Sequence, residues 1–248
     1  MKIVRTGQAQ RRTNVREERK VIGTSGQQLV QIPAREKTNS QISPYCVPNE
    51  YICAEIGRYL RLPIVPGSIT EERGNIPKYW YTVLDFGEEQ PLSVANPKEC
   101  IDSLPELCAG IVLFDILIAN GDRTVNNLFF NKNFDPPELR LFDHEAALLG
   151  ATDKQAEGRL TGSLVKDLGI PDHCLAPLVP VQDLTGCRWM KRIADLPDYL
   201  IEETCQDAAQ YGMTPEETKT VITFLLERRH NLQHLVNEHK DKLGKGCK

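Results

Sequence analysis

Two stretches of the chain carry side chains suited to phosphoryl transfer. Residues 120–130 contain Asp122 and, five residues later, Asn127; residues 141–145 contain Asp143. Transfer of a γ-phosphoryl group from ATP needs an oriented acceptor hydroxyl and phosphate charge that is neutralised by metal. Carboxylate and amide oxygens are ligands that suit Mg²⁺. The spacing therefore predicts that Asp122 faces the hydroxyl and that Asn127 and Asp143 bind Mg²⁺.

Two other interpretations of the same residues stay open. Asn, Gly and Asp are favoured in turns for backbone reasons, so residues 120–127 also fit an ordinary polar turn. The combination of D-x-x-x-x-N, a strand, a turn and an apolar strand that ends in Asp favours chemistry over that interpretation. Hydrolysis of a phosphate ester by the same carboxylates is a weaker hypothesis, because it usually draws on more acids or histidines near the metal.

The elements around these residues are predicted to hold them on a rigid support. Ser103 and Glu106 have the spacing of a capping box, and the helix that they open is apolar nearly all round until Asn120. Such a helix must be buried. Asp115 inside it is expected to form local hydrogen bonds, since an unpaired buried carboxylate is costly. Two short apolar strands follow, 127–131 and 138–142, so the polar residues are expected on a loop and a hairpin.

The flanking parts of the chain differ in pattern. The first 45 residues are predicted to form a hairpin of short strands, a helix is expected from Asn49 to the Leu62-Pro63 stop, and another strand over 80–84. Beyond residue 103 helices dominate, the clearest one beginning at Thr214. A small α+β lobe followed by a mainly helical lobe is therefore the predicted fold class.

The composition of the chain limits its possible size class, partners and location. The 248 residues are 40% hydrophobic and 26% charged, with a net charge of −4, which predicts one sizeable domain or two lobes and no general attraction to nucleic acid. No apolar run reaches the length of a membrane span, and the first 20 residues, with seven Lys/Arg, lack a secretory pattern. Eight cysteines occur without a C-x-x-C pair, which predicts reduced thiols and a cytoplasmic location.

The residues that suggest chemistry also carry a family resemblance. Residues 114–123, Asn127-Leu128 and 141–145 resemble the small HipA-like kinase family, with a more distant similarity to phosphatidylinositol 3/4-kinases. Residues 49–63 resemble the family's first-lobe helix and its exit, and 197–239 resemble its helical tail. The match is concentrated at 110–145. It implies a two-lobed protein-kinase-like fold, with a first lobe at about 21–90 and a second at about 91–248. The composition of residues 1–20 separately predicts a basic and flexible segment.

The resemblance also implies roles for individual residues. Asp122 corresponds to the catalytic base, Asn127 and Asp143 to the Mg²⁺ ligands, and Glu50 to the acid that steadies an ATP-binding Lys. At the position of that Lys the chain has Gln31, which cannot supply a point charge to the phosphates. Arg35 and Lys37 are candidate substitutes by their nearness in sequence.

Two functions follow from this pattern. The first is an ATP- and Mg²⁺-dependent kinase that phosphorylates a protein Ser/Thr or a small alcohol, the acceptor being unidentified. The alternative is a pseudokinase or partner-binding module impaired by Gln31. His144 directly follows Asp143, where it either orients that loop, contacts phosphate or simply packs. His230 and His234 are spaced like metal ligands but lack the Glu of H-E-x-x-H, so a solvated helix face is expected there.

Overall fold

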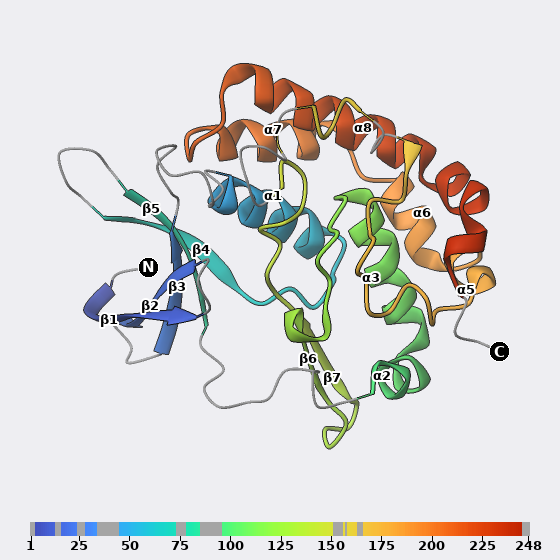
Figure 1. Cartoon of the computed structure of the whole chain (residues 1–248), viewed down its shortest axis with the longest axis horizontal. Coiled ribbons are helices and arrows are strands. Elements are labelled where there is room, and N and C mark those ends of the chain that lie inside the picture. The colour runs from blue at the N-terminus through green and yellow to red at the C-terminus, as the bar shows by residue number, and fades with distance from the viewer. Residues whose placement is uncertain are drawn as a thin grey trace.

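The protein has a β-sheet on one side and a mainly helical part on the other, with helix α1 between them in Figure 1. The computed structural model describes the backbone of residues 3–12, 16–23 and 28–33, and backbone and side chains over 45–72, 78–83, 96–150, 156, 158–162 and 166–244; Leu84 is described in backbone only. This arrangement confirms the predicted α+β class with a helical C-terminal part.

The sheet is antiparallel and five-stranded, in the order β1-β2-β3-β5-β4. Its strands are β1 (Ile3–Arg12), β2 (Arg16–Gly23), β3 (Gln28–Pro33), β4 (Gly67–Glu72) and β5 (Lys78–Leu84). The β2–β3 hairpin and the strand over 80–84 match the sequence prediction. Gln31 lies on β3, the central strand, where its backbone is paired with Arg19 on one side and Thr82 on the other. Arg35 and Lys37 lie outside the described residues.

Helix α1 (Cys46–Tyr59) joins the sheet to the helical part, since it contacts β3, β4 and β5 as well as α7. The sequence prediction that Asn49 opens this helix is wrong, because the first turn is already formed at Cys46, with Pro48 inside it, where a missing N–H costs nothing. The Asn49 side chain caps nothing and donates instead to the carbonyl of Glu145 at 2.8 Å. The helix ends before Arg61, which has φ 64.

Helix α3 (Pro105–Leu117) is the buried centre of the helical part, as its apolar sequence predicts. The remaining helices are α2 (Pro97–Ser103), α5 (Val181–Thr185), α6 (Arg188–Ala194), α7 (Asp198–Ala209) and α8 (Pro215–Glu238). The capping box predicted at Ser103 is wrong, because Ser103 closes α2 and its hydroxyl donates to the carbonyl of Glu99. At Thr214 the capping box with Glu217 is confirmed.

The end of α3 determines where the polar loop begins. The amide of Asn120 donates to the carbonyl of Asp115 at 2.9 Å, and the amide of Ala119 to Ile116 at 3.3 Å. These are the two hydrogen bonds of a Schellman motif, in which one residue adopts the left-handed conformation. Ala119 is that residue, with φ 50. The helix therefore ends at Leu117, earlier than the Asn120 boundary that the sequence predicts.

A hairpin follows the loop and is attached to the exit of α1. It consists of β6 (Leu128–Asn131) and β7 (Glu138–Leu141), close to the predicted strands. Leu141 donates to the carbonyl of Pro63 and accepts from the amide of Val65, both at 2.9 Å. Among the described residues, none of the helices combines the length and apolarity needed to traverse a bilayer.

Candidate active site

The loop after α3 places Asp122 and Asn127 together. Asp122 is exposed, whereas Asn127 is buried at the end of a short 3-10 turn, η3 (Val125–Asn127). The Nδ2 group of Asn127 donates to the backbone carbonyl of Asp122. An amide that donates through nitrogen keeps its oxygen as an acceptor. The Oδ1 atom of Asn127 is thus the part of the side chain suited to a cation.

Asp143 follows β7 and has an uncommon backbone conformation. Its φ of 63 lies in the left-handed region, which non-glycine residues seldom adopt. Such conformations persist where surrounding contacts determine them, and they cluster at functional sites. The contacts of the neighbouring residues Phe142 and His144 hold the backbone of Asp143 in this conformation.

Arg123 connects the loop to the segment that carries Asp143. Its Nη1 atom donates to the carbonyl of Asn127 at 3.0 Å and to the carbonyl of Phe142 at 2.7 Å. Its Nε and Nη2 atoms donate to the two carboxylate oxygens of Asp115 at 2.9 and 3.1 Å. Arg123 is fully buried. One guanidinium therefore fixes α3, the loop and the end of β7 relative to each other.

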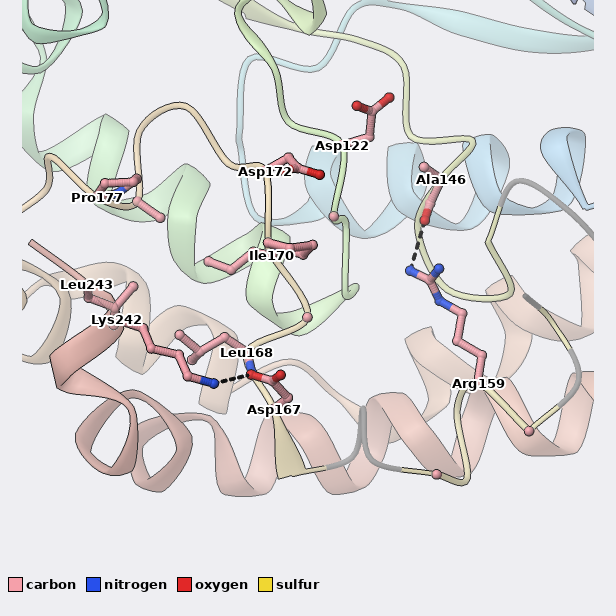
Figure 2. Close-up of a pocket in the computed structure, with 16 residues that line it drawn as sticks. Asp122, Ala146, Arg159, Asp167, Leu168, Ile170, Asp172, Pro177, Lys242 and Leu243 are labelled. Carbon is pink, nitrogen blue, oxygen red and sulfur yellow. Dashed lines mark hydrogen bonds and ion pairs between the residues drawn. The ribbon is translucent and has the colours of Figure 1, made fainter. Parts of the chain in front are cut away.

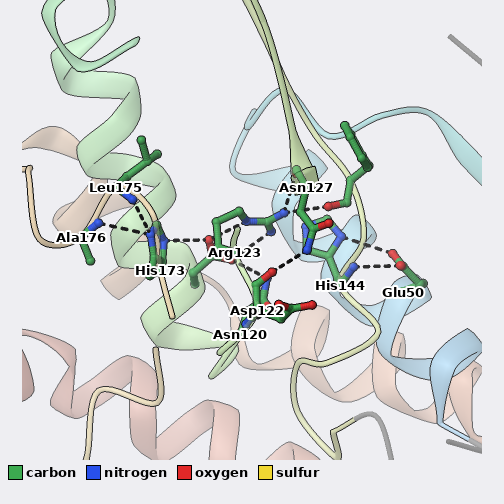
Figure 3. A network of polar contacts seen from close by, with 11 residues as sticks. Glu50, Asn120, Asp122, Arg123, Asn127, His144, His173, Leu175 and Ala176 are labelled. Atoms are coloured by element: carbon green, nitrogen blue, oxygen red, sulfur yellow. Dashed lines mark hydrogen bonds and ion pairs between the residues drawn. The ribbon is translucent and has the colours of Figure 1, made fainter. Parts of the chain in front are cut away.

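Asp115 is satisfied by three neighbours, shown in Figure 3. Besides Arg123, it accepts from Asn120 Nδ2 and from His173 Nε2, both at 3.1 Å. The amides of Leu175 and Ala176 donate to His173 Nδ1, so the ring hydrogen is on Nε2 and points at Asp115. The prediction that Asp115 forms local hydrogen bonds is confirmed for Asn120 and Arg123, whereas His173 is a distant partner, 58 residues away in sequence.

The charges of this cluster shift its pKa values in opposite directions. Burial would raise the pKa of Asp115, but the Arg123 guanidinium and the hydrogen bonds from His173 and Arg123 outweigh it and hold that pKa well below its usual range. The pKa of Asp122 is raised, first because its carboxylate is partly shielded from water and then by the negative charge of Asp143. Asp122 therefore binds a proton more readily than an ordinary surface Asp.

Glu50 lies on α1 and contacts the residue after Asp143. Its Oε1 atom accepts from the backbone amide of His144 at 2.8 Å, and its Oε2 atom lies 3.3 Å from His144 Nδ1. Both side chains are almost completely buried. The His144 ring packs edge-on against Phe114 of α3, with 6.0 Å between ring centroids. His144 therefore orients its loop through Glu50 as well as packing.

A cavity of about 930 Å³ opens beside Asp122, as Figure 2 shows. Its walls come from the loop, from residues within 158–162 and 167–172, and from the turn η5 (Lys240–Lys242) with Leu243. Arg159 on its wall donates to the carbonyls of Ala119 and Ala146 at 2.9 and 3.0 Å. Lys242 is paired with Asp167 at 3.0 Å. A molecule in this cavity would meet the Asp122 carboxylate at its edge.

The structure thus brings together some of the residues predicted from sequence and separates others. Asp122, Asn127 and Asp143 share one site, and Glu50 borders it through His144. The side chain of Gln31 lies outside the described residues. His230 and His234 are exposed on α8, as expected.

Sequence reasoning missed Arg123 and His173, the partners of Asp115. One signal was available, because a lone Asp in an apolar helix requires a cation nearby, and Arg123 is eight residues away. Nothing comparable marks His173, whose contact with Asp115 spans 58 residues of sequence.

The donor set fits Mg²⁺. Asn127 Oδ1 and the Asp143 carboxylate are hard oxygen ligands, and Mg²⁺ is commonly held by one or two carboxylates together with phosphate oxygens and water. Within the described part of the chain, no group of three or more His, Cys, Asp or Glu side chains gathers as a metal site. The Asn–Asp pair matches a metal that substrate phosphates help to hold.

Comparison with solved structures identifies the fold. The Helicobacter pylori proinflammatory kinase CtkA aligns over 96% of each chain with a TM-score of 0.64 at 12% identity. The Golgi casein kinase with Mn/ADP bound aligns over 99% of this chain and 75% of its own, with a TM-score of 0.50 at 10% identity. A chain from the HipA, HipB and operator DNA complex of Shewanella oneidensis MR-1 gives a TM-score of 0.49 at 14% identity, over 94% and 67% of the two chains.

The protein has a kinase-like fold. The first two alignments carry that conclusion, since the fold extends over nearly the whole of this chain. No protein-family model and no curated protein matches the sequence. Membership of the HipA-like family therefore stays a prediction from the residues at 110–145. Identities of 12% and 10% indicate the fold alone, and activity must be argued from the site.

Proposed function

We propose that the protein is an ATP- and Mg²⁺-dependent phosphotransferase of HipA-like type that phosphorylates a hydroxyl group. The observation that carries the proposal is the joining of Asp122, Asn127 and Asp143 through one loop and one buried guanidinium. That the fold is shared with kinases, one of which was crystallised with Mn/ADP, supports it further. The boundary between the two lobes at about residue 90 is part of the same proposal.

In this proposal Asp122 is the catalytic base. The acceptor oxygen forms a bond to the γ-phosphorus as the bond to the β,γ-bridging oxygen breaks and ADP leaves. The hydroxyl proton goes to the Asp122 carboxylate, which acts as a positioned general base. Mg²⁺ held by Asn127 and Asp143 would neutralise phosphate charge. Arg123 keeps the three side chains in register without reaching the substrate, because it is fully buried.

The cavity beside Asp122 is the proposed entry for the acceptor. Its wall is partly apolar, with Leu168, Ile170 and Pro171, and the carboxylate of Asp172 lies at the same end as Asp122 (Figure 2). A protein segment or a small alcohol placed there would present a hydroxyl to Asp122. The chemical identity of the acceptor is left to experiment.

The first test uses ATP labelled at the γ-phosphate, with the protein itself and generic basic and acidic proteins as acceptors. We expect Mg²⁺-dependent labelling by the wild type and a loss of about 10²- to 10⁴-fold in Asp122→Asn, the usual contribution of a general base. Asp183→Asn, which changes an exposed residue of helix α5, is the matched control and should keep full activity. Thermal unfolding should show that both variants fold.

Three results would contradict the proposal. Full labelling by Asp122→Asn would show that Asp122 is not the catalytic base. Free phosphate released without labelled protein would favour hydrolysis of a phosphate ester. Absence of any Mg²⁺-dependent ATP binding by the wild type would favour the second candidate, a pseudokinase or partner-binding module. The observation behind that candidate is Gln31, a neutral residue on the central strand where kinases of this type place a Lys.

A further inference from the structure

Helix α1 binds two successive residues of the segment that follows Asp143. Asn49 Nδ2 donates to the carbonyl of Glu145 at 2.8 Å, and Glu50 Oε1 accepts from the amide of His144 at 2.8 Å. Cys46, one turn earlier, donates through its thiol to the Glu145 carboxylate at 3.2 Å. The first turn and a half of α1 thus holds this segment by side-chain hydrogen bonds.

Both carboxylate oxygens of Glu50 take part in these contacts. One carboxylate oxygen receives the backbone amide of His144 and the other faces its ring nitrogen Nδ1, with the side chains 2% and 1% exposed. A carboxylate only accepts, so Nδ1 of the His144 ring carries a hydrogen. His144 Nε2 is buried without a hydrogen-bond partner in the described structure. The ring is therefore held by Glu50 at Nδ1 and by packing against Phe114.

We propose that Glu50 and His144 form a positioning pair that holds Asp143 in the geometry required to bind Mg²⁺. Asp143 has φ 63, a conformation that requires support from its neighbours. Arg123 supplies support before it, through the carbonyl of Phe142, and Glu50 supplies support after it, through the amide of His144. Asp143 is thus fixed from both sides. The inference rests on the proposed function and revises the role predicted for Glu50.

The contact between Glu50 and His144 changes what Gln31 implies about the role of Glu50. If Glu50 served mainly to steady a phosphate-binding cation, its carboxylate would face that cation. With Gln in place of Lys at position 31, Glu50 would then have no such cation at that position to pair with. Here both carboxylate oxygens face His144. Glu50 then acts on the metal side of the site, through His144.

Glu50→Gln is the decisive variant because it keeps the shape of the side chain. A carboxylate offers two acceptor oxygens and both are in use, whereas an amide offers one oxygen and places an NH₂ group against a donor. The backbone amide and the ring of His144 then compete for one acceptor. Glu55→Gln is the matched control, since it makes the same chemical change on the same helix, where Glu55 is partly exposed and paired with Arg58.

The first measurement tests the contact without any ligand. In protein labelled with ¹⁵N-histidine, long-range ¹H–¹⁵N spectra report which ring nitrogen carries the hydrogen. We expect the Nδ1–H form for His144 in the wild type and in Glu55→Gln, and a changed or mixed tautomer in Glu50→Gln. An Nε2–H ring in the wild type would overturn the inference, whether or not the protein binds ATP.

The second measurement separates the metal role from a nucleotide role. Thermal unfolding is followed while Mg²⁺ is varied at fixed ATP, and while ATP is varied at saturating Mg²⁺. We expect Glu50→Gln to raise the half-effective Mg²⁺ concentration at least tenfold and to change the half-effective ATP concentration less than threefold. A double variant with His144→Phe should be no weaker than Glu50→Gln alone, because the two residues act as a unit.

The possible results lead to different conclusions. A shift in ATP dependence with unchanged Mg²⁺ dependence would overturn the inference and restore the role of Glu50 beside a phosphate-binding cation. Unchanged dependence on both ligands would overturn it as well. A wild type that shows no Mg²⁺·ATP effect would overturn the proposed function and this inference with it, while the tautomer measurement would still decide whether Glu50 holds His144.

Discussion

Asp115 and Arg123 form an ion pair from which water is excluded. Both side chains have 0% exposure, and their Nε–Oδ2 distance is 2.9 Å. Both make further hydrogen bonds, Asp115 with His173 and Asn120 and Arg123 with two backbone carbonyls. A buried pair is tolerated when its geometry and its additional hydrogen bonds offset the loss of water. In this protein the Asp115–Arg123 ion pair orients the loop that carries Asp122.

We predict that Asp115→Asn lowers the free energy of unfolding by about 3–5 kcal/mol at pH 7, because it leaves the Arg123 charge buried and unpaired. The pKa of Asp115 is depressed in the folded protein, so its contribution is complete above its unfolded pKa of about 3.9 and is lost as pH falls through the folded pKa. The stability gap to wild type should therefore be constant from about pH 7 to 5 and narrow below about pH 4.

Urea unfolding at several pH values measures this gap. Asp183→Asn, which removes an exposed carboxylate on α5, is the control and should change stability by less than about 0.5 kcal/mol. A gap below about 1 kcal/mol for Asp115→Asn at neutral pH would show that the ion pair does not organise the loop.

At the scale of elements, α3 is the support on which the site is built. Its C-terminal Schellman motif turns the chain into the loop, and α8 secures that end through Arg228, whose Nε atom donates to the carbonyl of Ile116 at 2.6 Å. Burial lowers the pKa of Arg228 to about 10. Toward the other end, α6 approaches so closely that a glycine is required in α3. At Gly110 an added Cβ would lie 2.6 Å from the Trp189 ring.

Gly110→Ala should destabilise the protein although alanine favours helices. The gain in helix propensity is about 1 kcal/mol, but the new methyl group meets a buried indole that has no space to retreat. Overpacking of this kind costs about 1–3 kcal/mol, so after the gain in propensity we expect a net loss of up to about 2 kcal/mol. Denaturant unfolding checks it, and adding Trp189→Phe should restore part of the loss. A Gly110→Ala protein as stable as wild type would contradict the close approach of α3 and α6.

At the scale of the whole molecule, the site is assembled from distant parts of the chain. Helix α1 contacts the sheet on one side and α7 on the other. Tyr211, after α7, packs edge-on against Tyr51 of α1 and Tyr79 of β5, with centroid distances of 5.8 and 5.1 Å. The helix that carries Glu50 is thus held by both parts of the fold. A ligand that binds only this assembled state stabilises the entire protein.

ATP with Mg²⁺ should therefore raise the melting temperature. At a concentration 100-fold above the dissociation constant, the gain is about 2.7 kcal/mol. For a chain of this size that corresponds to roughly 5–10 °C. Asp143→Ala should lose the Mg²⁺-dependent part of the rise, whereas Asp183→Ala should keep it. An equal rise in Asp143→Ala would show that the metal is bound elsewhere, and differential scanning fluorimetry suffices for the comparison.

The sequence by itself determined the local features. Helical periodicity located α3 and α8, two short apolar runs located the β6–β7 hairpin, and the spacing of Asp122, Asn127 and Asp143 indicated one site for phosphoryl chemistry. These features depend on residues close together in the chain. The boundaries were less well predicted, as at Asn49 and Ser103, because their side chains bond to partners that local capping patterns do not include.

Only the tertiary structure decided which side chains support those three residues. The contact of Glu50 with His144 joins residues 94 apart in sequence, and that of His173 with Asp115 joins residues 58 apart. Single-sequence patterns record period and spacing, and neither reveals a partner brought near by folding. Burial makes such partners necessary, because an uncompensated buried charge or hydrogen-bonding group destabilises the folded state. The sequence thus indicated the candidate reacting groups, and the fold specified what holds them in place.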